Sequence, residues 1–238
     1  MKSHLFRRTS IGRLSFLLPL MVAAACSGSA TSSSVSSSTG TPSSTPGETI
    51  ITRNFLGAGQ HPAVTVKAPS PRWKPFKDFG VTSGCCGVAF WDVGKVARDP
   101  CHSIGHLSDP GPTVDDLVTA LEAQSLRHAT APTGVTLAGY HGKYLRWSVP
   151  AHWKVTGDGN FAGCDVQPNG HRDFVSWWGN GGVGERWQQE AGQVDRLWIL
   201  DVNGQRLVVD ASHAPGTTKA QLDEQDQVVR SLQFVTPA

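Results

Sequence analysis

The stretch "VDRLWILDVNGQRLVVDA", Val194–Ala211, carries the strongest structural signal in the chain. Branched and aromatic apolar residues crowd two runs of strand length, as is typical of β-strands. Between the runs lies Asn203-Gly204, a pair that suits a type I′ turn because both central residues accept positive φ. The sequence therefore predicts an antiparallel β-hairpin here.

Further strand-like runs lie on both sides of this hairpin, separated by glycine and proline turns. Residues 87–93 form the best of them, and residues 134–150 read as a second hairpin that turns near His141-Gly142. Residues 232–235 can add a last edge strand. The chain is thus predicted to consist mainly of antiparallel hairpins.

Two segments have the capping residues and apolar spacing of helices. Residues 110–124 carry Thr113 as a cap, and residues 218–231 carry Thr218. Hairpins combined with two helices indicate an α+β fold. We expect a mostly antiparallel sheet with about two helices packed on one face.

The first 25 residues have the layout of a secretory signal. Four basic residues and no acidic one accompany an apolar run at 14–25. That run is about 12 residues long, whereas spanning the hydrocarbon core of a bilayer takes about 20. The segment is therefore predicted to direct export rather than to remain as a transmembrane helix.

Cys26 follows Val22-Ala23-Ala24-Ala25, which resembles the lipobox of bacterial lipoproteins, although that family prefers Leu where Ala23 stands. The resemblance implies that residues 1–25 are a lipoprotein signal peptide and that Cys26 is the lipidation site. It places the protein on the extracytoplasmic face of the cell membrane, held by its acyl chains. The alternative is an ordinary signal-peptidase site, in which Cys26 is incidental.

Residues 26–50 are predicted to be a disordered tether. Ser and Thr dominate this segment, and it has almost nothing apolar to bury. A flexible chain of this length spans roughly 25 Å. The remaining residues, 51–238, are enough for a single globular domain with its own core.

The charge of the mature chain argues against nucleic-acid binding. Four of the 21 basic residues lie in the signal, and the 17 that remain are outnumbered by 19 acidic residues. A nucleic-acid-binding domain shows a basic excess or a basic stripe. The expected partners are therefore the membrane, through the lipid anchor, and a ligand or protein of the cell envelope.

Four cysteines lie in the predicted domain: Cys85, Cys86, Cys101 and Cys164. An even number in an exported protein indicates disulfides, and four cysteines allow three pairings. Adjacent Cys85 and Cys86 can bond each other only through a strained turn, or they can separate and pair with the other two. The residues alone leave both arrangements open.

Four stretches resemble a family of exported actinobacterial proteins of unassigned function. They are "DPCH" at 99–102, "GPTVDDLVTAL" at 111–121, "GYHGKYLRWSVP" at 139–150 and "GQVDRLWILDVNGQRLVVDA" at 192–211. The resemblance implies a disulfide between Cys101 and Cys164 and says nothing of Cys85-Cys86. The order of elements is also similar to that of Mog1/PsbP-like envelope lipoproteins, as a likeness of fold alone.

Motifs for catalysis, cofactors and metals are weak. "GNGGVG" at 179–184 matches a dinucleotide fingerprint in letters, but the residues after it do not read as the required helix, so a hairpin loop is predicted. Cys101-His102 and His106 lack a second ligand pair at zinc-like spacing. We expect no metal and no cofactor.

The tryptophans offer a candidate binding surface. The chain has 8 of them, and three bracket the glycine loop: Trp177, Trp178 and Trp187. Tryptophans beside a loop can form a platform for a sugar or lipid moiety, although core packing is the commoner role. Arg196, in the best strand, joins them as a speculative ligand contact, with a structural ion pair as its alternative.

These observations favour a non-enzymatic envelope lipoprotein whose extracytoplasmic domain binds a ligand or partner. The alternative is a hydrolase whose site is dispersed in sequence, for instance at His171, Asp173 and Asp195. Such a hydrolase needs a deep pocket with a perturbed His or carboxylate. A structural envelope scaffold, with an exposed apolar patch and no pocket, is the third hypothesis.

Overall fold

The computed structural model describes residues 49–53, 63–77, 79–157, 159–180 and 184–235. The expected signal peptide, Cys26 and nearly all of the expected tether lie outside these residues. β1 begins at Thr49, two residues before the expected start of the domain. None of the described helices is long and apolar enough to cross a membrane.

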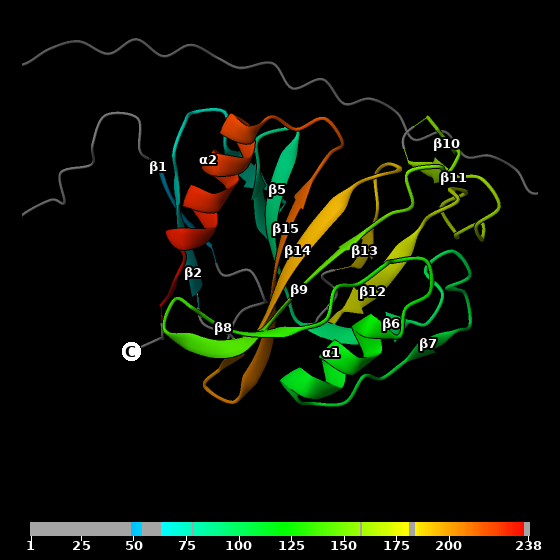
Figure 1. Cartoon of the computed structure of the whole chain (residues 1–238), viewed down its shortest axis with the longest axis horizontal. Coiled ribbons are helices and arrows are strands. Elements are labelled where there is room, and N and C mark those ends of the chain that lie inside the picture. Colours follow the sequence, from blue (N-terminus) through cyan, green and yellow to red (C-terminus); the bar gives the residue numbers. More distant parts are fainter. Residues whose placement is uncertain (1–48, 54–62, 78, 158, 181–183, 236–238) are drawn as a thin grey trace, which may run out of the picture. The chain divides into compact units, whose positions relative to one another are not determined.

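The predicted hairpin forms the centre of the fold (Figure 1). β14 (Val194–Val202) and β15 (Gln205–His213) pair along their whole lengths. Asn203 and Gly204 make the turn with φ values of 57° and 81°, as a type I′ turn requires. The central element of the sequence prediction is confirmed.

A seven-stranded antiparallel sheet grows from this hairpin in the order β3-β4-β5-β15-β14-β9-β8. Its other strands are β3 (Lys74–Phe76), β4 (Gly80–Thr82), β5 (Cys86–Trp91), β8 (Thr133–Leu137) and β9 (Tyr140–Ser148). This arrangement confirms a mostly antiparallel sheet in an α+β domain.

The turn between β8 and β9 is not where the sequence predicted it. Ala138 and Gly139, with φ of 52° and 86°, make the turn, while His141 and Gly142 lie inside β9. Gly142 serves a different purpose, because a Cβ there would collide with the backbone oxygen of Ile199 on β14. The glycine permits close strand approach rather than a turn.

Three smaller sheets complete the described structure. A four-stranded sheet contains β13 (Glu185–Trp187), β12 (Val175–Gly179), β6 (Val93–Ala97) and β7 (Leu107–Ser108). A three-stranded sheet contains β1 (Thr49–Arg53), β2 (Ala63–Ala68) and β16 (Gln233–Val235). β10 (Val155–Thr156) and β11 (Asn160–Phe161) form a two-stranded ribbon.

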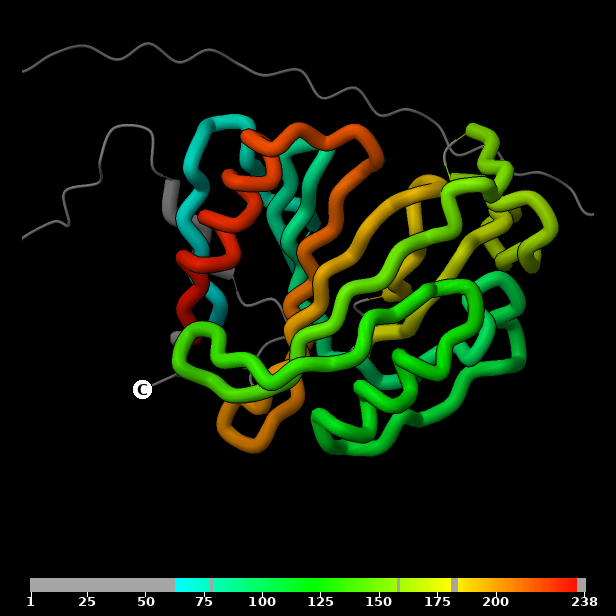
Figure 2. Tube along the Cα trace, viewed as in Figure 1, coloured from blue at the N-terminus to red at the C-terminus, as the bar shows by residue number. Residues whose placement is uncertain are grey.

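Both predicted helices are present with their predicted caps. Thr113 caps α1 (Val114–Glu122) and Thr218 caps α2 (Lys219–Arg230), each in a complete capping box. α2 contacts β2, β5 and β15, whereas α1 contacts β9 and β14. Figure 2 shows the two helices well apart along the sheet.

The two helices contact the seven-stranded sheet from different faces. Arg196 of β14 bonds Asp226 of α2, at 2.6 Å, while Lys143 of β9 lies 3.8 Å from Asp115 of α1. Lys143 pairs with Ile199 in the regular ladder, and positions 196 and 199 point to opposite faces because side chains alternate along a strand. The expectation of both helices on one face is therefore corrected.

A disulfide joins Cys101 to Cys164, as the resemblance implied. It lies in a small apolar cluster with Val149, Phe161 and Phe174, separate from the main core. Cys85 and Cys86 are free thiols in the structure. The pairing that remained open from the residues alone is thus decided.

Candidate functional site

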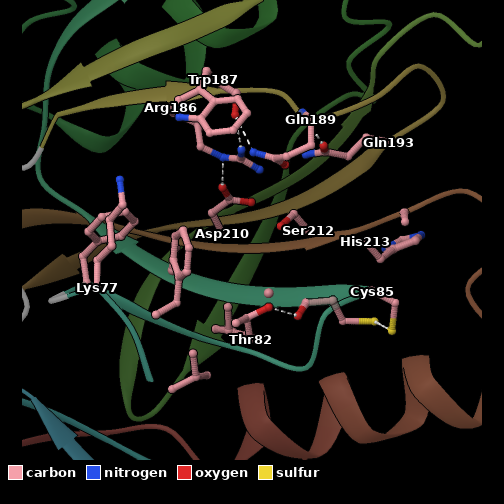
Figure 3. Close-up of a pocket in the computed structure, with 18 of the residues that line it drawn as sticks. Lys77, Thr82, Cys85, Arg186, Trp187, Gln189, Gln193, Asp210, Ser212 and His213 are labelled. Carbon is pink, nitrogen blue, oxygen red and sulfur yellow. Dashed lines mark hydrogen bonds and ion pairs between the residues drawn. The ribbon is translucent and has the colours of Figure 1, made fainter. Parts of the chain in front are cut away.

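A pocket of about 510 Å³ lies between the seven-stranded sheet and β13. Asp210 and Ser212 of β15 and Gly87 and Ala89 of β5 form its floor, because alternation along the strands points them to the same face. Figure 3 shows Lys77 at one end, Asp210 in the middle, Cys85 at the other end and Trp187 across the pocket. Aromatic side chains contribute apolar wall: Phe76, Phe79, Trp91 and Trp187.

Asp210 is the central polar group of the floor. Its side chain is 1% exposed, and its Oδ2 accepts a hydrogen bond from Arg186 Nε at 2.5 Å. Its Oδ1 is buried and has no hydrogen-bond partner among the described residues. Burial raises the pKa of Asp210 to about 6, opposed by the positive charge of Arg186 and reinforced by the negative charge of Asp195.

Asp195 lies beside it on β14 and is fully satisfied. Its carboxylate accepts hydrogen bonds from Arg127 Nη2, Arg186 Nη2, Trp147 Nε1 and Gln193 Nε2 at 2.5 to 2.9 Å. Burial opposes its ionisation, but the two guanidinium groups and the hydrogen bonds outweigh it, so the pKa of Asp195 is lowered. Asp195 thus serves as a buried counter-ion beneath the pocket.

Arg127 and Arg186 provide the two positive charges of this cluster. Arg127 is fully buried, stacks over the Trp147 ring at 4.0 Å and has its pKa lowered to about 10 by burial. Arg186 bridges the two aspartates and also donates to the Trp187 carbonyl oxygen. Two cations and two carboxylates balance one another, so the cluster offers no spare positive charge to a ligand.

The rim of the pocket is weakly acidic. Glu185 and Glu190 line it, with Lys77 as the opposing cation. Burial raises the pKa of Glu185, and Lys77 partly offsets this. Lys77 Nζ also lies over the rings of Phe76 and Phe79 at 5.8 and 5.9 Å, so its charge is partly directed toward aromatic faces.

The far end of the pocket holds two thiols and an imidazole. Cys85 Sγ and Cys86 Sγ are 3.0 Å apart, and both residues line the pocket with His213. The side-chain Nδ1 of His213 is buried without a hydrogen-bond partner among the described residues. Burial, with the nearby charge of Arg196, lowers the pKa of His213, which favours its neutral form.

The predicted aromatic and cationic contacts are dispersed by the fold. Trp187 lines the pocket, but Trp177 is completely buried and stacks with Trp147 at 5.7 Å. Trp178 lies on β12 and is half-buried. Arg196 projects from the opposite face of the sheet, where it bonds Asp226 and Gln225 of α2.

The residues of the hydrolase alternative do not assemble in this pocket. Asp195 is sequestered by its donors, and neither His171 nor Asp173 lines the pocket. Burial raises the pKa of Asp173, and the charge of nearby His171 partly offsets this. Among the described residues, no three His, Cys, Asp or Glu side chains are arranged to hold a metal ion.

The glycine loop joins two antiparallel strands. β12 ends at Gly179 and β13 begins at Glu185, and the two strands pair as a hairpin. A dinucleotide site needs a helix after the glycines. The predicted hairpin loop is therefore confirmed from the strands that flank it.

Sequence reasoning missed Asp210, Glu185 and the pocket end at Cys85. The sequence indicates Asp210 only weakly, as a lone acid within an apolar strand. A buried carboxylate at such a position is stable only when it has a partner. That partner, Arg186, lies 24 residues away on another sheet. Comparison with known proteins finds no matching family and no curated protein of significant similarity.

Proposed function

We propose that the chain is a membrane-anchored lipoprotein of the cell envelope whose domain binds a small hydroxyl-bearing ligand, of the sugar class, in this pocket. The observation that carries the proposal is the buried, unpartnered Oδ1 of Asp210 at the floor of a pocket with aromatic walls. A buried acceptor without a partner is costly, and a ligand hydroxyl donating to it removes that cost.

The composition of the walls supports a sugar rather than an anionic ligand. Trp187 and Phe79 offer rings against which the C–H face of a sugar can pack. Glu185, Gln189 and Asp210 offer polar atoms to its hydroxyls. The guanidinium of Arg186 is already shared between two aspartates, so a phosphate or carboxylate would find no free cation on the floor.

The anchor and the location rest on the sequence. The apolar signal and Cys26 support lipidation, and the Ser/Thr-rich tether supports a domain held just outside the membrane. The disulfide between Cys101 and Cys164 supports an oxidising compartment, since such bonds are rare in the cytosol. The resemblance to exported actinobacterial proteins points the same way.

Calorimetric titration of the full chain tests the ligand class. The probes are methyl α-glucoside as a neutral sugar, glucosamine as a cationic one and glucose 6-phosphate as an anionic one, each up to about 10 mM to capture weak binding. We expect binding of the first two and none of the third. Absence of binding by both non-phosphorylated sugars would overturn the sugar assignment.

A matched pair of variants locates the binding. Trp187→Leu removes one of the aromatic side chains that line the pocket, whereas Trp198→Leu removes a half-buried tryptophan on the opposite face of the sheet. We expect the first to weaken sugar binding by on the order of tenfold and the second to leave it within about twofold. Equal effects of the two variants would place the binding elsewhere.

The anchor has its own test. Intact mass of the membrane-fraction protein should show a chain that begins at Cys26 and carries added acyl mass. The Cys26→Ala variant should lose that mass and leave the membrane fraction. An unacylated wild-type chain in the soluble fraction would replace the lipoprotein assignment with a simply exported protein.

A further inference from the structure

The turn between β4 and β5 holds two adjacent thiols together. Ser83 and Gly84 make the turn, with Gly84 at φ 92°, and Ser83 N donates to the carbonyl oxygen of Cys86 at 2.9 Å. Ala214 N donates to the Cys85 carbonyl oxygen at 3.0 Å. Backbone hydrogen bonds therefore hold both cysteines, and their two sulfurs lie 3.0 Å apart.

The two thiols differ in access. Cys86 is 3% exposed and belongs to the main core, whereas Cys85 is half-buried at the pocket end. Burial and the hydrogen bond with Cys85 raise the pKa of Cys86 to about 12. Arg72 lies near enough to interact electrostatically with both thiols. Thiolates are the attacking species, and Cys86 is both buried and protonated. The more accessible Cys85 is therefore the residue that reacts with an external reagent first.

We propose that Cys85 and Cys86 are a thiol–disulfide exchange site that reacts with small disulfides of the glutathione class and closes to a vicinal disulfide. Cys85 loses its proton to solvent, and its thiolate attacks one sulfur of the reagent, which forms a mixed disulfide and releases the first reagent thiolate. Cys86 then loses its proton to solvent, and its sulfur attacks Cys85 Sγ. The mixed bond breaks, the second reagent thiolate leaves, and both thiolates take up protons, so two protein thiols are oxidised and one reagent disulfide is reduced.

Formation of the Cys85–Cys86 disulfide needs little movement of the sulfurs, but this disulfide is more strained than Cys101–Cys164. The sulfurs must approach by about 1 Å to reach a bond length near 2.05 Å. Adjacent Cα atoms are about 3.8 Å apart across a trans peptide, shorter than the usual span of disulfide-linked residues. Strained disulfides are the more easily reduced ones. We therefore expect Cys85–Cys86 to open under milder reduction than Cys101–Cys164, whose Cα atoms lie 4.4 Å apart.

The test follows peptide masses of the full chain. Protein treated with mild reductant is exposed to oxidised glutathione, alkylated and digested with trypsin, which releases residues 78–95 with both thiols in one peptide. We expect the mass of this peptide to be two hydrogen atoms below that of the unmodified dithiol peptide, without a retained glutathione. Mild reduction should return it to the dithiol. The peptides that contain Cys101 and Cys164 should stay linked throughout.

Two variants separate the roles of the thiols. Cys86→Ser cannot close the ring, so it should retain glutathione on Cys85, whereas Cys85→Ser should retain on the order of tenfold less because Cys86 is buried and protonated. Two free thiols in the wild-type peptide after exposure, or a lasting glutathione adduct on it, would overturn the proposal. This readout does not depend on sugar binding, so the two proposals fail separately.

Discussion

Asp195 and Asp210 are neighbours on the central hairpin, share the guanidinium of Arg186 and are both buried, yet they differ in every other respect. Asp195 accepts hydrogen bonds from four side chains and its pKa is lowered. Asp210 accepts one bond from Arg186, has a buried oxygen without a hydrogen-bond partner among the described residues, and has its pKa raised to about 6. The fold satisfies the oxygens of the Asp195 carboxylate beneath the pocket. The Asp210 carboxylate on the pocket floor has an acceptor oxygen left over, which the proposed ligand would use.

The difference shows that burial alone does not mark a functional carboxylate. Both side chains are at most 1% exposed. What separates them is the number of donors that the fold supplies, because an ionised buried acid is stable only when its oxygens are satisfied. The predictions below test this difference in the donors that the fold supplies to the two carboxylates.

The largest effect is expected from Asp195→Asn. This change leaves Arg127 and Arg186 with only Asp210 as a buried counter-ion, and breaking a buried ion pair costs about 3–5 kcal/mol of unfolding free energy. Asp210→Asn, its matched control, also breaks an ion pair with Arg186, but it should cost less at pH 7, because burial disfavours the ionised form of Asp210 and Arg186 keeps Asp195 as a partner. Urea denaturation measures both, and equal losses would contradict the comparison.

The next effect concerns pH. The pKa of Asp210 is about 6 in the fold, above the roughly 3.9 of an unfolded chain, so the folded state binds the proton more tightly. Its contribution to stability is therefore lost as pH rises from about 4 to about 6, by at most about 3 kcal/mol. Asp195, with a lowered pKa, contributes the opposite slope, since its stabilisation is lost as pH falls.

The Asp210→Asn variant removes the pH dependence of stability that Asp210 contributes. Because asparagine does not titrate, the stability of this variant relative to wild type should improve between about pH 4 and about pH 6 and then level off. Urea midpoints at several pH values give the difference directly. Parallel pH profiles for the two proteins would mean that Asp210 does not titrate in this window.

Local patterns predicted the parts of the fold that local chemistry decides. Asn203-Gly204, Thr113 and Thr218 each act within a few residues, and each was placed correctly. The turn predicted near Gly142 was wrong, because this glycine is needed for the close approach of Ile199 on another strand. The side of the sheet taken by each helix was also wrong, since no local pattern states the path of the connecting chain.

The candidate site was harder to predict because it is assembled from distant segments. Trp187 was predicted because it lies next to the glycine loop in the sequence. The pairing of Asp210 with Arg186 depends on how two sheets pack. That of Asp195 with Arg127 depends on the path of the chain between α1 and β8. Arg127 and Asp195 are 68 positions apart in the sequence, and no periodic pattern indicates their contact. Asp195 was among the residues named from the sequence and Asp210 was not, and only the packing shows how their roles differ.

The smallest effect is expected when one hydrogen-bond donor to Asp195 is removed. Trp147→Phe keeps an aromatic ring but removes the Nε1–H that donates to Asp195 at 2.9 Å, and a hydrogen bond to a charged group is worth about 2 kcal/mol. Trp187→Phe makes the same chemical change in the pocket wall and should cost less than about 1 kcal/mol, because its ring is half-buried. Urea denaturation again compares the two variants. A larger loss for Trp187→Phe would show that ring volume, not the donor count at Asp195, governs the stability of this face.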